Sequence, residues 1–243
     1  MKKFELTSEF ITNIFGTKLF RIKALIEFGN VKAGELGGFV EKEENLNHEG
    51  NAWVYGNAEV YGNARVYGNA SVCDDARVYG NASVYGNARV CDDAWVYGNA
   101  EVYGNARVYG NASVCDDARV YGNASVYGNA WVYGNARVCD DARVYGNASV
   151  YGNARVCGDA RVCGDARVYG NADYATVHGF GSEYRTTTFF KTKAGEIGVR
   201  CGCFYGNLSE FRKKVVETHG ETKKAKEYLM LADLMEFRFS DNS

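Results

Sequence analysis

The stretch from Trp53-Val54-Tyr55-Gly56-Asn57-Ala58 to Arg167-Val168-Tyr169-Gly170-Asn171-Ala172 is a six-residue unit repeated twenty times without a break. Ala stands two residues before each Val, and Gly-Asn, Asp-Asp or Gly-Asp begins two residues after it. Because side chains alternate along a strand, Val and Ala point to one side and their neighbours Arg and Tyr to the other. The pattern predicts short strands with Val and Ala inside, separated by corners at the Gly-Asn pairs, which readily adopt positive φ.

The spacing resembles the hexapeptide repeat of left-handed parallel β-helices, in which an aliphatic residue and a small residue four places later line the lumen. Val54 and Ala58 are the first such pair in this chain. The resemblance implies a mainly β fold, a single-stranded left-handed parallel β-helix of about seven triangular coils. One departure is that the residue after Val is Tyr in 14 units and Cys in 6, where that family has small or acidic residues.

Extending the repeat register outward predicts how the helix ends. The next Val positions fall on His48 before the repeat and on Tyr174 and Phe180 after it. We expect these larger side chains to plug the lumen, since an open solenoid end exposes unpaired strand edges. The predicted domains are an N-terminal β cap at 1–47, the β-helix at 48–180 and a small α+β C-terminal domain at 181–243.

The segments outside the repeat predict their own elements. Before it we expect a strand at 18–28 and a glycine-rich turn at 34–38. In the C-terminal domain, Asn207 and Glu210 have the spacing of a capping box that opens a helix. The remaining C-terminal elements are strands at 185–193 and 196–204, a helix at 208–219, and a second helix at 222–236 with one apolar stripe.

The composition excludes several classes of function. The chain has 243 residues, with 28 basic and 30 acidic side chains and a net charge of -2. This balance gives no general attraction for a nucleic-acid polymer or an anionic membrane. Neither a membrane-spanning apolar run nor a signal peptide is evident, so we expect a protein of the cytoplasm.

Four terminal segments carry a second resemblance. Residues 20–25, 31–40, 185–190 and 201–204 look like the corresponding parts of a family of uncharacterised phage and prophage hexapeptide-repeat proteins. The resemblance implies a bacteriophage-encoded protein acting in a bacterial cytoplasm, and it implies no particular reaction.

The histidines argue against catalysis on the coils. Hexapeptide-repeat transferases use a coil histidine as general base, whereas this chain has only His48, His178 and His219, all outside the twenty units. A zinc hydratase of this fold would need three coil histidines as ligands. We therefore expect no catalytic residue and no cofactor, and the acyltransferase alternative rests on fold analogy alone.

Two cysteine pairs are 18 residues apart and would stack on neighbouring coils, namely Cys73 with Cys91 and Cys139 with Cys157. Their expected separation permits a disulfide. Because disulfides are rare in a reducing compartment, we expect free thiols that replace tyrosine as smaller residues.

Four carboxylates would stack at one corner, from Asp74, Asp75, Asp92 and Asp93. Such a group of oxygens suits Ca²⁺. The alternative is that they are ordinary turn residues, since Asp is common in turns.

A short glycine motif follows the repeat. His178, Gly179, Gly181 and Ser182, together with Arg185, would form an anion-binding turn. The alternative for the same residues is a plain chain reversal.

Residues 59–88 recur identically at 101–130, a shift of seven units, which moves the copy to a different face of a three-sided coil. A site built along one face would be scrambled by such a duplication. We therefore interpret the coils as scaffold and the protein as a non-enzymatic structural or interaction solenoid. Its outer Tyr and Arg rows would bind a protein partner or a second copy, as in a homotrimer. The alternatives are a phage counter-defence protein that sequesters a host factor or a small nucleotide signal, and an acyltransferase-like enzyme.

Overall fold

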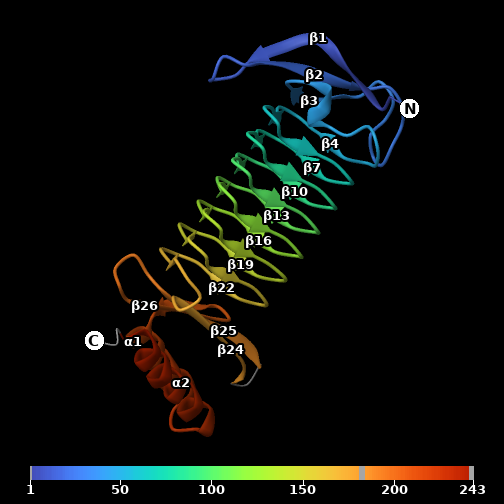
Figure 1. Cartoon of the computed structure of the whole chain (residues 1–243). Helices are drawn as coiled ribbons and strands as arrows, with labels where there is room; N and C mark the ends of the chain where they lie inside the picture. The colour runs from blue at the N-terminus through green and yellow to red at the C-terminus, as the bar shows by residue number, and fades with distance from the viewer. Residues whose placement is uncertain (1, 181–183, 241–243) are drawn as a thin grey trace.

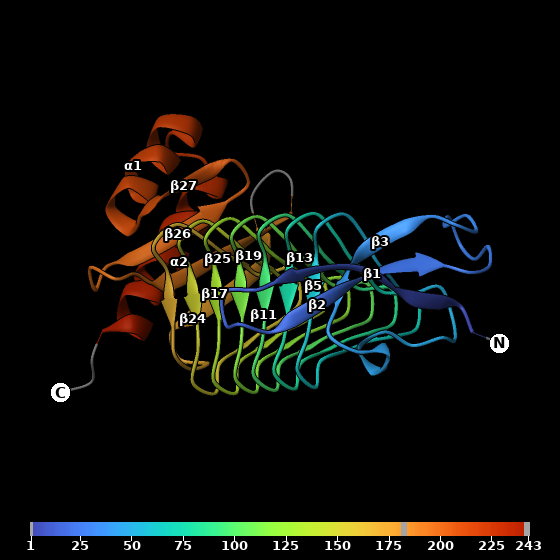
Figure 2. The same ribbon diagram turned by 90° about the horizontal axis from the view of Figure 1, so that it is seen from above.

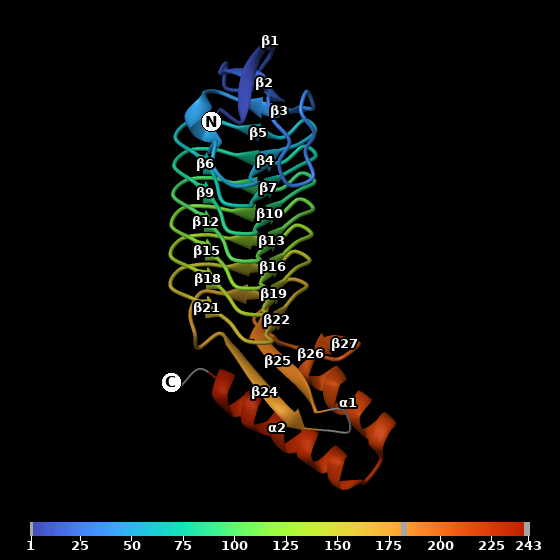
Figure 3. The same ribbon diagram turned by 90° about the vertical axis from the view of Figure 1, so that its right-hand side faces the viewer.

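Parallel pairing between residues 18 positions apart builds the body of the molecule. Glu59 pairs with Arg77 and Val60 with Val78, and the same register recurs from coil to coil. The computed structural model, which describes residues 2–180 and 184–240, shows these coils stacked as a prism with a cap at each end (Figures 1 and 3). The predicted parallel β-solenoid of about seven coils is confirmed.

Three parallel sheets form the sides of the prism, named here after their first coil strand. The β4 face contains Trp53–Val54 (β4), Ser71–Val72 (β7), Arg89–Val90 (β10), Arg107–Val108 (β13), Ser125–Val126 (β16), Arg143–Val144 (β19) and Arg161–Val162 (β22). The β5 face contains Glu59–Val60 (β5), Arg77–Val78 (β8), Trp95–Val96 (β11), Ser113–Val114 (β14), Trp131–Val132 (β17), Ser149–Val150 (β20) and Arg167–Val168 (β23). The β6 face contains Arg65–Val66 (β6), Ser83–Val84 (β9), Glu101–Val102 (β12), Arg119–Val120 (β15), Arg137–Val138 (β18) and Arg155–Val156 (β21).

The lumen is filled by the repeated small apolar residues. Every Val and every Ala from Ala52 to Val168 is 0% exposed, and together they form one continuous core. The predicted inward placement of Val and Ala is therefore confirmed. Close packing of such small side chains leaves the lumen without room for a ligand.

The corners take the conformation expected of them. Gly56 has φ +60° and Gly62 has φ +68°, and at the Asp-Asp corners Asp74 and Asp92 have φ values of 61° and 58°. Glycine and aspartate are among the residues that tolerate this left-handed region. Asparagines beside the corners form ladders, in which one side-chain amide donates to the side chain one coil later, as in Asn63 to Asn81 at 3.1 Å.

An antiparallel extension closes the N-terminal end. It contains Phe4–Thr12 (β1), Lys18–Ala24 (β2) and Leu36–Val40 (β3), followed by the 3-10 turn Glu43–Asn45 (η1). Strand β1 pairs with β2 and β2 with β3, and β3 then joins β5 in parallel (Figure 2). Of residues 34–38, expected to be a turn, Gly34 lies in a turn with φ +85°, whereas Leu36 already starts strand β3. At Gly37 a Cβ would lie 2.5 Å from Val54 O, so this strand needs glycine to approach the coil.

The prediction that His48 plugs the lumen is wrong. Leu46, which is 1% exposed, pairs with Val66, so the aliphatic position of the first coil lies two residues earlier than the repeat register places it. The segment from Leu46 to Val54 is two residues longer than a regular unit, which accounts for this shift. His48 lies outside the lumen and stacks on Phe4 at 4.4 Å.

The C-terminal cap is a four-stranded antiparallel sheet covered by two helices (Figure 3). Its elements are Tyr174–Phe180 (β24), Arg185–Lys191 (β25), Ile197–Cys201 (β26), Phe204–Asn207 (β27), Leu208–His219 (α1) and Lys223–Phe239 (α2). The predicted capping box is confirmed, because Asn207 Oδ1 accepts from Glu210 N at 2.9 Å and Glu210 Oε2 accepts from Asn207 N at 2.8 Å. The small α+β C-terminal region is thus confirmed as well.

Tyr174 and Phe180 do not continue the coil, contrary to the prediction. Both belong to β24, where they pair with Phe190 and Arg185 of β25, so the 18-residue register no longer applies to them. Phe190, which is 0% exposed, joins the lumen core and closes this end of the prism. Tyr174 packs against the same core from the side, and Phe180 packs in the core beneath the helices.

The stacked cysteine pairs are joined. Cys73 with Cys91 and Cys139 with Cys157 form disulfides with Cα atoms 4.6 Å apart, so the expectation of free thiols is wrong for these four residues. Stacking of neighbouring coils brings each pair into bonding range without any change of backbone. Each disulfide staples two successive coils, one pair on the β4 face and the other on the β6 face.

The in and out pattern predicts opposite responses at adjacent positions. We expect Val108→Asp to cost about 4 kcal/mol or more of unfolding free energy, because an unpaired charge would enter the lumen. Tyr109→Ser on the outer surface should cost only about 1 kcal/mol. Thermal melting followed by circular dichroism measures both, and equal losses would contradict the assignment.

The two disulfides predict that the free energy of unfolding depends on the redox state. In oxidised protein, Cys73→Ser should lower the unfolding free energy by about 3 kcal/mol, the chain-entropy value for a loop of this size. In fully reduced protein the same change should have little effect. Chemical denaturation with and without reductant measures the difference, and alkylation of oxidised, unfolded protein should label Cys115, Cys163, Cys201 and Cys203 only. Labelling of all eight cysteines would contradict the pairing.

Candidate ligand-binding site

Tyrosines on the outside of the coils form rows of stacked rings. On the β6 face the row consists of Tyr67, Tyr85, Tyr103 and Tyr121, with ring centroids 4.8, 4.8 and 5.0 Å apart and interplanar angles of 3–4°. We call this set the β6-face row. Shorter rows occur on the other faces, such as Tyr61, Tyr79 and Tyr97 on the β5 face and Tyr109, Tyr127 and Tyr145 on the β4 face.

Parallel stacking decides what a row presents to solvent. Each ring inside a row has both faces covered by its neighbours, so only its edge and hydroxyl are accessible. Burial accordingly raises the pKa of Tyr67, Tyr85 and Tyr103 above the ordinary value. A flat sugar or base ring therefore finds no free aromatic face along the middle of a row, and a ring face is available only where a row ends.

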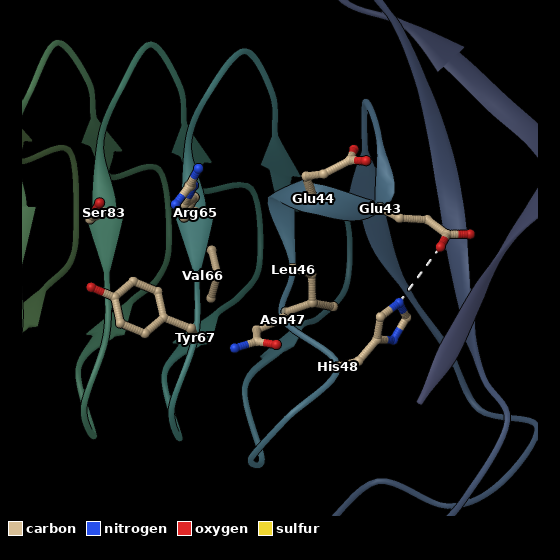
Figure 4. Close-up of a pocket in the computed structure, with 9 residues that line it drawn as sticks. All are labelled: Glu43, Glu44, Leu46, Asn47, His48, Arg65, Val66, Tyr67 and Ser83. Carbon is tan, nitrogen blue, oxygen red and sulfur yellow. Dashed lines mark ion pairs between the residues drawn. The ribbon is translucent and has the colours of Figure 1, made fainter. Parts of the chain in front are cut away.

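A cavity of about 590 Å³ opens at the N-terminal end of the β6-face row (Figure 4). Its lining includes Glu43, Glu44, Asn47, His48, Arg65 and Tyr67. The N-terminal segment supplies the first four of these residues and the first coil supplies the last two. Figure 4 shows Tyr67 and Asn47 on one side of the view and the Glu43–His48 pair on the other.

Local contacts hold one wall of this cavity in place. Lys3 N donates to His48 Nδ1 at 3.2 Å, so the imidazole proton lies on Nε2, which faces Glu43 Oε2 at 3.6 Å. Lys2 Nζ donates to the other Glu43 oxygen at 2.6 Å. The Lys2 hydrogen bond is the largest cause that lowers the pKa of Glu43, and His48 contributes to it. Because its Nδ1 lone pair already accepts from Lys3 N, His48 is suited to shaping the wall rather than to accepting a substrate proton at that atom.

The register shift at Leu46 explains why the repeat pattern of the sequence does not predict this cavity. Asn47 N donates to Val66 O at 3.0 Å, just as Tyr67 N donates to Val84 O at 3.1 Å. Asn47 thus occupies the position, here called a rung, at which the next ring of the β6-face row would stand. The sequence indicates the shift by an aliphatic residue at 46 instead of 48. The position after the aliphatic residue, which is Tyr in most units, therefore moves from Glu49 to Asn47.

The predicted calcium corner consists of stacked turn residues. Asp74 Oδ2 accepts from Asp92 N at 3.3 Å, and Asp92 Oδ2 accepts from Gly110 N at 2.8 Å, so both carboxylates satisfy backbone groups one coil later. Asp75 Oδ1 accepts from Asn57 Nδ2 at 3.3 Å, and Asp93 is exposed. These contacts explain the aspartates as corner residues, and calcium binding at this corner stays a prediction.

The predicted anion turn is only partly described. His178 Nδ1 lies 3.0 Å from Thr186 Oγ1, and Gly179 has φ +89°. Arg185 starts β25 opposite Phe180, and its side chain lies beside Gly202. Gly181 and Ser182 fall outside the described residues. The structure describes the antiparallel strands β24 and β25 on either side of these two residues, and anion binding there stays a prediction.

Comparison with known proteins identifies the repeat. Eight segments match a family described as YdcK Beta solenoid repeat, at residues 58–74, 76–92, 82–98, 100–116, 118–134, 136–152, 148–164 and 160–172. All of them lie within the coils, and together with the fold they show that the chain is a β-solenoid repeat protein. No curated protein matches the chain. Within the described residues, neither α1 nor α2 is long and apolar enough to cross a membrane.

The tyrosine rows predict sensitivity to alkali. Burial raises the pKa of row tyrosines such as Tyr61, Tyr97 and Tyr145, whereas the unfolded chain ionises near the ordinary value of 10. Stability from the rows is therefore complete below pH 10 and is lost as the pH rises above it. Titration of phenolate absorbance, run beside circular dichroism, should show ionisation delayed in the folded protein and completed on unfolding. Ordinary tyrosine titration with the fold intact would contradict buried rows.

Proposed function

We propose that this β-solenoid repeat protein is a non-enzymatic interaction solenoid, in which a rigid prism holds two different caps at a fixed separation. The observation that supports the proposal is the distribution of exposed apolar side chains. On the coils from Trp53 to Val168, only Trp131 is a large apolar residue half exposed, whereas both caps carry groups of them. Grouped apolar exposure of this kind marks contact surfaces.

The caps differ in what they offer. At the N-terminal hairpin, Phe10, Ile14 and Phe15 are 50%, 71% and 62% exposed. On α2, Met230, Leu234 and Phe237 are 70%, 54% and 74% exposed, and their spacing places them on one side of the helix, away from the buried stripe that covers the sheet. Two unlike apolar surfaces at opposite ends of a prism suit a protein that bridges two partners or two copies of itself.

The outer Tyr and Arg rows are the second proposed contact surface. Ring edges, hydroxyls and guanidinium groups alternate along the faces, and they suit a polar interface such as the homotrimer proposed for them. The apolar groups on the caps favour contacts at the ends over contacts along the rows.

The non-enzymatic part of the proposal rests on the histidines. The Nδ1 lone pair of His48 accepts from Lys3 N, and the twenty repeat units contain no histidine in their sequence. An acyltransferase-like activity would need a base of another kind. We further propose a phage origin and action in the bacterial cytoplasm, supported by the resemblance of the terminal segments.

A second candidate function is favoured by the cavity at the N-terminal end of the β6-face row. In this alternative the protein sequesters a host factor or a small nucleotide signal, as a counter-defence protein would. The cavity falls within the range of volumes typical of small-ligand sites.

Solution mass and partner capture test the main proposal. We expect the full chain either to self-associate or to retain a defined protein from a bacterial lysate. Serine substitutions at Met230 and Phe237, or at Phe10 and Phe15, should abolish that association. Trp131→Ser on the coil is the matched control and should leave it intact. A monomer that retains nothing, or association lost in the control alone, would contradict contacts through the caps.

A further inference from the structure

The β6-face row lacks a ring at its N-terminal end. Asn47 stands on the rung before Tyr67, and its Oδ1 accepts from Glu49 N at 3.0 Å, so the amide is held by its own turn. Among the described residues, the stacking partner of the Tyr67 ring is Tyr85, on the C-terminal side. The opposite face of Tyr67 therefore borders the cavity, where the row would continue if a further ring were present.

On the β5 face, Glu41 occupies the corresponding position, since its N donates to Val60 O at 3.1 Å, and the chain itself covers the first ring of that row from the side. Tyr61, the first ring of the β5-face row, is 6% exposed and packs in a cluster with Leu19 and Phe39. Phe15 of the hairpin also lies against it, with ring centroids 6.4 Å apart. Among the described residues, the first ring of the β6-face row has no aromatic cover of this kind, which leaves it available to a group from outside the chain.

Two charged side chains that line the cavity are available to bind a ligand. Arg65 and Glu44 both line the cavity and are exposed, and neither forms an ion pair within the part of the chain that the structure describes. A guanidinium group donates to carbonyl, ring-nitrogen or phosphate acceptors, and a carboxylate accepts from amino and ring N–H groups. Ser83 and the Tyr67 edge add hydroxyls to the lining.

We infer that this cavity binds a purine nucleotide, whose base stacks on Tyr67 as the next ring of the β6-face row. A planar base fits the spacing of 4.8–5.0 Å between rings of the row. Glu44 accepts from the amino edge of the base, and Arg65 donates to its acceptor edge or to the phosphate. The strength of aromatic stacking depends little on which base is bound, so the carboxylate and guanidinium groups provide the selectivity. The cavity of about 590 Å³ accommodates a mononucleotide.

This inference deepens the sequestration alternative and does not depend on contacts through the caps. It is tested on purified full-length protein by isothermal titration calorimetry with GMP and AMP as probes. Ribose 5-phosphate, which has the sugar and phosphate but no base, is the matched ligand control. We expect both nucleotides to bind with one site per chain and ribose 5-phosphate to bind at least about tenfold more weakly.

Variants locate the site. Asn47→Tyr adds a ring to the row at the place proposed for the base, so it should abolish binding while the melting temperature is kept or raised. Tyr67→Ser should weaken binding by about tenfold or more, the loss expected when a stacking face is removed. Tyr109→Ser is the matched control, because it removes the first ring of the β4-face row and should leave binding unchanged.

Three outcomes would overturn the inference. The first is no nucleotide binding at about 1 mM ligand. The second is equal affinity for ribose 5-phosphate, which would mean that phosphate alone is recognised. The third is unchanged binding in a folded Asn47→Tyr protein. Partner capture by the caps would be unaffected by any of these results, so the two proposals fail separately.

Discussion

The backbone hydrogen bond between successive coils is the interaction on which the rest of the structure depends. Along the coils, the N–H of a residue donates to a carbonyl 17 residues later, as Tyr85 N does to Val102 O at 3.0 Å. The strands are only two residues long, so no strand is stable without the coil above and below it. Val and Ala fill the lumen tightly enough that successive coils cannot slip sideways, and the 18-residue register is kept throughout.

That register places equivalent residues directly above one another. Tyrosines become stacked rows, asparagines become amide ladders, and two cysteine pairs become staples. A site that recognises one particular ligand must therefore lie where this regular stacking is interrupted. The interruptions lie where a row ends, and one of them is the position of Asn47, where the N-terminal cap meets the first coil.

The duplicated block shows that the same residue takes a different role when its neighbours on the adjacent coils differ. Residues 59–88 and 101–130 are identical, yet the shift of seven units puts the two copies on different faces. Cys73 in the first copy stacks on Cys91 and is bonded to it. Cys115, its counterpart in the second copy, falls in the tyrosine row of the β5 face and remains a free, buried thiol. Its neighbours one coil away are Tyr97 and Tyr133, so it has no cysteine to bond.

The sequence by itself determined everything that follows from a strict local period. It predicted the coils, the buried Val and Ala, the corners and the capped helix α1, since each depends on residues near one another in the chain. Only the tertiary structure decided how the period begins and ends. Leu46 rather than His48 enters the lumen because the segment before Val54 is two residues longer than a regular unit, and Phe190 rather than Phe180 closes the far end because the chain turns back into an antiparallel sheet. The cavity beside Tyr67 belongs to the same class, because it arises where two differently registered segments meet in space.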